Sequence, residues 1–133
     1  MNNMVLVEDF AASAAELLHR AAEIATREHK DLLYGLSGRP LDSRKVARHL
    51  YATAQHLRAD GTGVNLGDAL QAVADEIGTS DTYRAAVMSM ELLIRAATGA
   101  PTACYEAWAE TATTDEAQGL LAVAVAFARR HIG

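Results

Sequence analysis

A glutamate and a histidine three positions apart, Glu16 and His19, have the spacing of metal ligands in carboxylate di-metal helical bundles. Such a pair lies on one face of a helix, but a di-metal site needs two pairs and two further glutamates. The chain has one pair, and an ordinary solvated helix face accounts for it equally well. We therefore expect no metal and no cofactor.

The single cysteine, Cys104, excludes an intrachain disulfide and a cysteine-rich metal site. In the first turn of an expected helix its thiol could be nucleophilic, because a helix N-terminus lowers a thiol pKa. A lone cysteine in an alanine-rich helix is more often a small buried apolar residue. An enzyme or small-molecule-binding bundle, with a site assembled from distant residues, stays open as an alternative function. Its candidate members are Glu16, His19, Cys104, Tyr105 and Glu110.

The segment 60–68 (DGTGVNLGD) imitates part of a calcium-binding loop. With Asp68 at the twelfth loop position, the first, third and fifth positions fall on Leu57, Ala59 and Gly61. None of these has a side-chain oxygen, so the calcium pattern fails. The segment also lacks the third glycine of a dinucleotide loop and follows an expected helix rather than a strand.

The segment 74–80 resembles the turn of a helix-turn-helix, with an alanine, a glycine four residues later and a polar cap. The position six residues after the glycine should be apolar, but it is Arg84. The second helix would open with Asp81 and carries few donors for base edges. A DNA-binding regulator is thus a second alternative, and we do not expect a nucleic-acid partner for a chain of net charge −5.

A basic segment is the strongest functional signal, because residues 39–58 carry a net charge of +4 and residues 60–116 one of −8. Spacings of 4, 3, 4 and 3 place five of its residues on one helical stripe, mostly away from the apolar positions. Arginine binds carboxylates bidentately and a tyrosine can anchor an interface. The stripe consists of Arg44, Arg48, Tyr51, Gln55 and Arg58.

We predict a small helical interaction or regulatory protein that docks an acidic protein partner through this stripe. The competing interpretation is intramolecular, with the acidic segment 60–116 folding back to neutralise the stripe. On the same expected helix, His49 and His56 lie two turns apart and are expected at the surface. We also expect a two-fold homodimer, because alanine-faced helices pack closely and leave few large residues to close a core.

The elements that must position these residues are helices. Alanine makes up 28 of the 133 residues and proline only two, which favours helix. No long strand-like alternation occurs, so we predict an all-α domain of five or six helices over residues 1–133. The expected helices cover about 8–33, 43–59, 65–77, 81–98, a stretch from 102, and 114–131.

Local signals mark several helix ends. Asp42 or Ser43 and Asn65 are expected N-caps, and Gly78 and Gly99 are expected stops. Thr113 and Glu116 form a capping box. The stretch 119–128 is apolar on every helical face, which predicts a buried C-terminal helix.

The chain shows no signal-peptide pattern and no stretch of about 20 apolar residues that could span a membrane. We therefore expect a cytoplasmic protein without a membrane partner.

Two stretches together resemble a family of small helical proteins from actinobacteria and their phages. The first is residues 17–25 (LLHRAAEIA). The second is residues 107–118, in which AWAE (107–110) and TTDEAQ (113–118) stand on either side of Thr111 and Ala112. The sequence departs from the family pattern at Ala109, where the family has asparagine, and at Glu110, where it has aspartate. The family has no established activity, so the resemblance implies a helical fold and leaves the function open.

Overall fold

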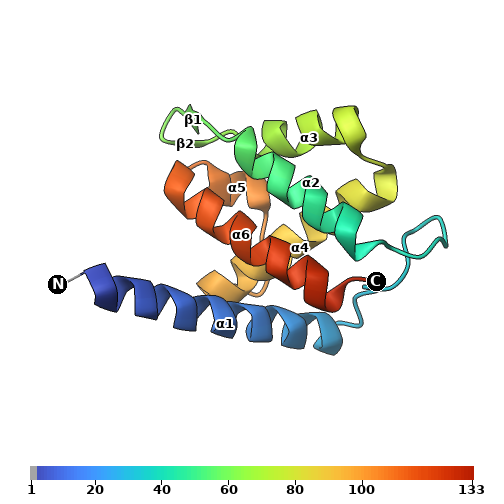
Figure 1. Ribbon diagram of the computed structural model, residues 1–133, viewed down its shortest axis with the longest axis horizontal. Helices are drawn as coiled ribbons and strands as arrows, with labels where there is room; N and C mark the ends of the chain where they lie inside the picture. Colours follow the sequence, from blue (N-terminus) through green and yellow to red (C-terminus); the bar gives the residue numbers. More distant parts are fainter. Residues whose placement is uncertain (1–2) are drawn as a thin grey trace.

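The chain folds into six α-helices and one two-stranded hairpin over residues 3–133, the part that the computed structural model describes (Figure 1). Side chains are described from residue 13 onward. The predicted all-α class is confirmed. The elements are α1 (Asn3–Arg27), α2 (Ser43–Gln55), β1 (Ala59–Asp60), β2 (Gly63–Val64), α3 (Leu66–Ile77), α4 (Ser80–Thr98), α5 (Tyr105–Ala109) and α6 (Thr114–His131).

Several helix ends form where local sequence predicts them. The Asp42 carboxylate accepts hydrogen bonds from the backbone N–H groups of Arg44 and Lys45, which caps α2. Thr113 and Glu116 exchange side-chain-to-backbone hydrogen bonds of 3.1 and 3.0 Å and form the expected capping box of α6. These short-range signals fix where α2 and α6 begin.

The first helix ends earlier than predicted, at Arg27 rather than near residue 33. His29 adopts a left-handed backbone with φ of 54°, and the N–H of Lys30 bonds to the carbonyl of Ala25. This is a Schellman-type ending built on a histidine, where glycine is the usual signal. The Asp31 carboxylate then accepts from the N–H groups of Leu33 and Tyr34, so the chain turns into a loop.

Two further helix ends differ from the prediction, and a third prediction is met only in part. The second helix stops at Gln55 instead of residue 59, and the short α5 begins at Tyr105 instead of Thr102. Asn65 occupies the N-cap position of α3, as predicted, but its side chain makes no capping hydrogen bond. Its side chain instead accepts from the Arg58 N–H and donates to the His56 carbonyl, at 2.7 and 3.0 Å. It thereby ties the end of α2 to the base of the hairpin.

The C-terminal helix α6 lies between α1 and α2 and also packs on α4 (Figure 1). Leu121, Ala124 and Phe127 are fully buried on it, while Ala122 is exposed. Alanine supplies twelve of the thirty buried apolar residues of the described chain, so the helix axes can approach closely. The predicted burial is confirmed for this side of the C-terminal helix, whereas the expectation that every face is covered is wrong.

The hairpin of β1 and β2 rests on the end of α5. Gly63 leaves no room for a Cβ atom, because the backbone of Ala109 and Glu110 lies directly against it. The Thr62 hydroxyl donates a 2.9 Å hydrogen bond to the Glu110 carbonyl. Backbone contact at Gly63, the Thr62 hydrogen bond and the buried Val64 side chain together set the position of the hairpin.

Candidate functional site

Four residues of the predicted stripe form one exposed surface on α2. Their opposite side is anchored, since Val46, Ala47 and Leu50 are buried against the rest of the bundle. Tyr51 stands out, because 62% of this aromatic side chain is exposed. We name this surface the α2 basic face; it consists of Arg44, Arg48, Tyr51 and Gln55.

The fifth predicted residue, Arg58, does not belong to the helical stripe. It is exposed but lies three residues beyond the end of α2, where its N–H bonds to Asn65. The prediction failed here because a 3.6-residue period applies only while the chain remains helical.

The arginines of the α2 basic face have no carboxylate partner among residues 13–133. The ion pairs of this part of the chain join other cations, such as Arg20 with Glu16 and Arg95 with Glu28. The direct salt bridges that the intramolecular interpretation requires are therefore not formed by the described side chains. Arg44 and Arg48 therefore carry their charges without a direct ion pair to any of these side chains, on the same face as the exposed Tyr51.

The position of the charges on α2 opposes helix stability. Arg44 and Lys45 occupy the first turn, which holds no acidic residue. The positive end of the helix dipole lies there and disfavours cations. The Asp42 carboxylate, which caps the N–H groups of Arg44 and Lys45, offsets part of this effect.

His49 faces the interior, contrary to the prediction that it lies at the surface. It is fully buried, its ring lies 6.1 Å from that of Tyr83, and its Nε2 donates a 3.1 Å hydrogen bond to the Leu70 carbonyl. Burial lowers its pKa, and Nδ1 has no partner. His56 is half-buried, with Nε2 3.9 Å from a carboxylate oxygen of Glu76.

The residues of the alternative enzyme site do not gather in one place. Glu16 and His19 are exposed on α1 and each pairs with a residue of the same helix. Glu16 lies 2.6 Å from Arg20, and His19 lies 2.5 Å from Glu23. Cys104 is exposed at the start of α5, so the expectation that it is buried is wrong. Of the five candidates, Tyr105 and Glu110 line one cavity.

That cavity, of about 790 Å³, lies between the hairpin, α3 and α5. Four carboxylates line it, together with two tyrosines. Burial and the neighbouring Tyr83 raise the pKa of Tyr105 above its ordinary value, so it stays a neutral phenol. Within the described part of the chain, no three histidine, cysteine or acidic side chains are arranged to hold a metal ion. The carboxylates are Asp60, Asp68, Glu106 and Glu110.

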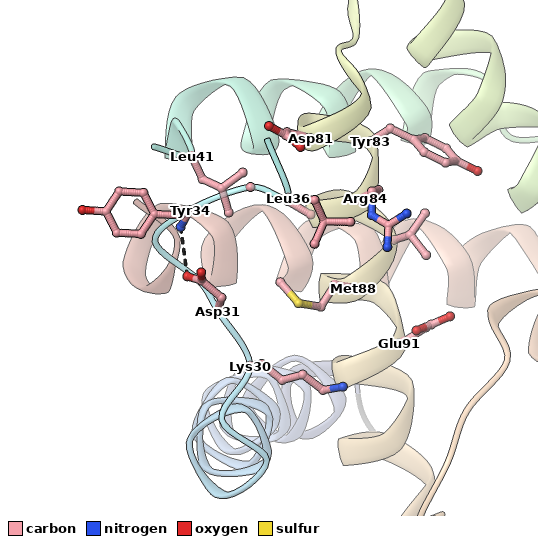
Figure 2. Close-up of a pocket in the computed structure, with 13 residues that line it drawn as sticks. Lys30, Asp31, Tyr34, Leu36, Leu41, Asp81, Tyr83, Arg84, Met88 and Glu91 are labelled. Carbon is pink, nitrogen blue, oxygen red and sulfur yellow. Dashed lines mark hydrogen bonds between the residues drawn. The ribbon is translucent and has the colours of Figure 1, made fainter. Parts of the chain in front are cut away.

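A second cavity, of about 600 Å³, lies between the loop 28–42 and α4 (Figure 2). It is more apolar than the acidic cavity and includes Leu36, Leu41, Val87 and Met88 in its wall. We name it the loop cavity. Sequence periodicity gave no sign of it, because its wall combines a loop with a helix distant in sequence.

The helix that would read DNA in the alternative interpretation is α4. It packs against α1, α2 and α6, and Ala86, Met90 and Leu93 on it are fully buried. Recognition helices of this class present a free face to the major groove. The position of α4 inside the bundle gives the DNA-binding alternative no support.

None of the helices described is both long and apolar enough to cross a lipid bilayer. Neither models of protein families nor curated proteins nor solved structures match this chain. The resemblance to small helical actinobacterial and phage proteins therefore stays a prediction.

Proposed function

We propose that this chain is a small interaction or regulatory protein whose α2 basic face docks an acidic segment of a partner protein. The exposure of Tyr51 between Arg48 and Gln55, on a helix anchored from behind, carries the proposal. Interface energy concentrates in tyrosine and arginine anchors of this kind. The partner chemistry is a carboxylate-rich surface with an apolar spot for the tyrosine ring.

The charges support this choice of partner. Both arginines are exposed without an ion-pair partner among the described side chains, so binding does not first have to break an internal salt bridge. A bidentate contact between arginine and carboxylate is stronger than a neutral hydrogen bond. Surface charges of this kind also accelerate encounter with an acidic protein at low salt.

The proposal is tested by affinity capture with the double variant Arg44→Glu, Arg48→Glu. The matched control is Arg27→Glu, Arg129→Glu, which changes the net charge equally at exposed positions outside α2. A true partner binds the wild type and the control, is lost with the α2 variant, and is released by added salt. With that partner purified, Tyr51→Ala is expected to weaken binding at least tenfold in a calorimetric titration.

Two results would contradict the proposal. One is an α2 variant that retains every partner of the wild type. The other is an α2 variant that melts far below the charge-matched control, which would show that the arginines stabilise the fold internally. Salt-dependent binding of a labelled DNA duplex, lost in the α2 variant, would assign the surface to nucleic acid instead.

We also propose that the chain forms a two-fold homodimer. The buried set of thirty apolar residues has one aromatic member, Phe127, so the core of a single copy holds few large side chains. Cyclic two-fold dimers are the commonest oligomers of soluble proteins. Light scattering at high micromolar concentration should give about twice the chain mass of 14.2 kDa, and a monomer mass would refute the dimer.

A further inference from the structure

Hydrogen bonds within the loop 28–42, and from this loop to α4, hold one wall of the loop cavity in place. The Leu41 N–H bonds to the Leu33 carbonyl at 2.8 Å, which closes the loop at its base. The Ser37 hydroxyl donates to the Asp81 carboxylate at the start of α4. The same carboxylate lies against Gly35, where a Cβ atom would collide with it.

Three carboxylates line this cavity, and the hydrogen bonds that two of them accept come from neutral donors and do not cancel their charge. The Asp31 carboxylate accepts from two backbone N–H groups of its own loop, which lowers its pKa. Asp81 accepts from Ser37. Glu91 is half-buried, and this burial raises its pKa. None of the three forms an ion pair with Arg84.

The two cationic side chains of the cavity differ in whether a carboxylate lies close enough to balance their charge. Lys30 lies 3.8 Å from Glu28, although the salt bridge between Glu28 and Arg95 is closer. Arg84 is exposed and has no carboxylate partner among residues 13–133. Arg84 is thus the group at this cavity with free capacity for an anion.

The apolar part of the cavity lies next to Arg84. Figure 2 shows the guanidinium of Arg84 close to Leu36, with Met88 between Arg84 and Lys30. Leu36 is 77% exposed and Tyr34, which also lines the cavity, is 51% exposed, so the loop presents two large apolar side chains at the cavity. A cavity of about 600 Å³ is within the range of small-molecule sites.

We infer that the loop cavity binds a small amphipathic carboxylate, such as a medium-chain fatty acid, with its headgroup on Arg84 and its tail along Leu36 and Met88. The guanidinium supplies paired donors for the carboxylate. The cavity volume of about 600 Å³ suits a small molecule rather than a protein segment, because small-ligand sites are concave and of this size. This site is separate from the α2 basic face and does not depend on it.

The test is a titration of the full chain with decanoate at pH 7.5, followed by calorimetry and by amide chemical shifts. Saturable binding should shift the amides of Leu36, Arg84 and Met88 most. Arg84→Gln removes the headgroup contact at an exposed position and should weaken binding at least tenfold. Leu36→Ser removes tail contact at an exposed position and should also weaken it.

Three controls test whether decanoate binding depends on the position of the arginine, on the charge of the headgroup and on a folded protein. Arg129→Gln removes an exposed arginine of α6 and should bind decanoate like the wild type. Decyltrimethylammonium has the same tail with the opposite charge and should bind at least tenfold more weakly. Melting curves must show that Arg84→Gln and Leu36→Ser remain folded.

Equal decanoate affinity of Arg84→Gln and wild type would overturn the inference, as would shifts confined to another surface. Binding of an acidic leucine-containing peptide without binding of decanoate would assign the cavity to a protein segment and equally overturn it. Because Arg84 and Leu36 lie outside α2, any of these results leaves the proposed docking function unaffected.

Discussion

At the scale of single residues, two glycines near the hairpin should respond to alanine in opposite ways. Gly63→Ala places a methyl group on the backbone of Ala109 and Glu110 and should cost about 1–3 kcal/mol of unfolding free energy. Gly67 lies inside α3 and its added Cβ would meet only Tyr105, at 3.6 Å. Gly67→Ala should therefore stabilise the protein by about 0.5–1 kcal/mol.

Urea unfolding of the two variants measures both effects. The opposite signs separate contact with the hairpin from the general preference for alanine. If Gly63→Ala were as stable as the wild type, the hairpin would not rest on α5 as described.

His49 should make the stability of the fold depend on pH. Its pKa is lowered by burial, so the unfolded chain binds a proton at higher pH than the folded one. Stability is full above the ordinary histidine pKa of about 6.5 and falls as pH drops toward the lowered value. One such group changes the unfolding free energy by at most about 1.4 kcal/mol per pH unit.

His49→Gln should reduce this loss, and urea unfolding at pH 7.5 and 5.5 measures it. The glutamine amide can donate to the Leu70 carbonyl but does not titrate. His131 contributes in the same direction, because burial and Arg130 lower its pKa, so part of the pH dependence should remain. An unchanged difference between the two pH values would show that His49 is not the responsible group.

At the scale of an element, α2 should gain stability when its first-turn arginine is reversed. Arg44→Glu replaces a cation by an anion at the positive end of the helix dipole and should add about 0.3–1 kcal/mol at low salt. Arg44 and Arg48 also repel each other across one helical turn, and either substitution removes this repulsion. Position 48, however, lies beyond the first turn, where the dipole acts most strongly. The gain from Arg48→Glu should therefore be smaller.

Thermal unfolding at low and at high salt tests this, because salt screens the dipole interaction. An Arg44→Glu variant that melts below both the wild type and Arg48→Glu would contradict it. A variant that is more stable yet loses its partner would place the function and the stability of α2 in conflict, as expected for a binding surface.

At the scale of the whole molecule, α6 joins the other helices and should tolerate a charge poorly on its buried side. Val123 is 6% exposed, whereas Val125 is half-buried. Val123→Asp should bury an unpaired carboxylate and cost several kcal/mol, a large part of the stability of a domain of this size. Val125→Asp can reach water and should cost less.

Circular dichroism during urea unfolding gives both free energies. Equal and small costs at the two positions would mean that α6 lies at the edge of the bundle. A Val123→Asp variant that unfolds cooperatively at the same urea concentration as the wild type would lead to the same conclusion.

The sequence by itself determined the features that depend on neighbours within one or two turns. The composition determined the helical class, Asp42 and Thr113 determined the starts of α2 and α6, and the apolar period placed Leu50 inward. Most of the α2 basic face follows from the same period, because an amphipathic helix exposes whatever lies opposite its apolar positions.

Only the tertiary structure decided what depends on which segments meet. His49 is a polar residue at the edge of the apolar stripe of α2, and α3 and α4 cover it with Leu70 and Tyr83. The arrest of α2 before Arg58 depends on Asn65, which binds across the hairpin. The loop cavity exists because the loop 28–42 folds over α4, a contact between positions about 45 residues apart along the chain, as in the bond of Ser37 to Asp81. Long-range packing leaves no periodic trace in a sequence, so these features required the fold.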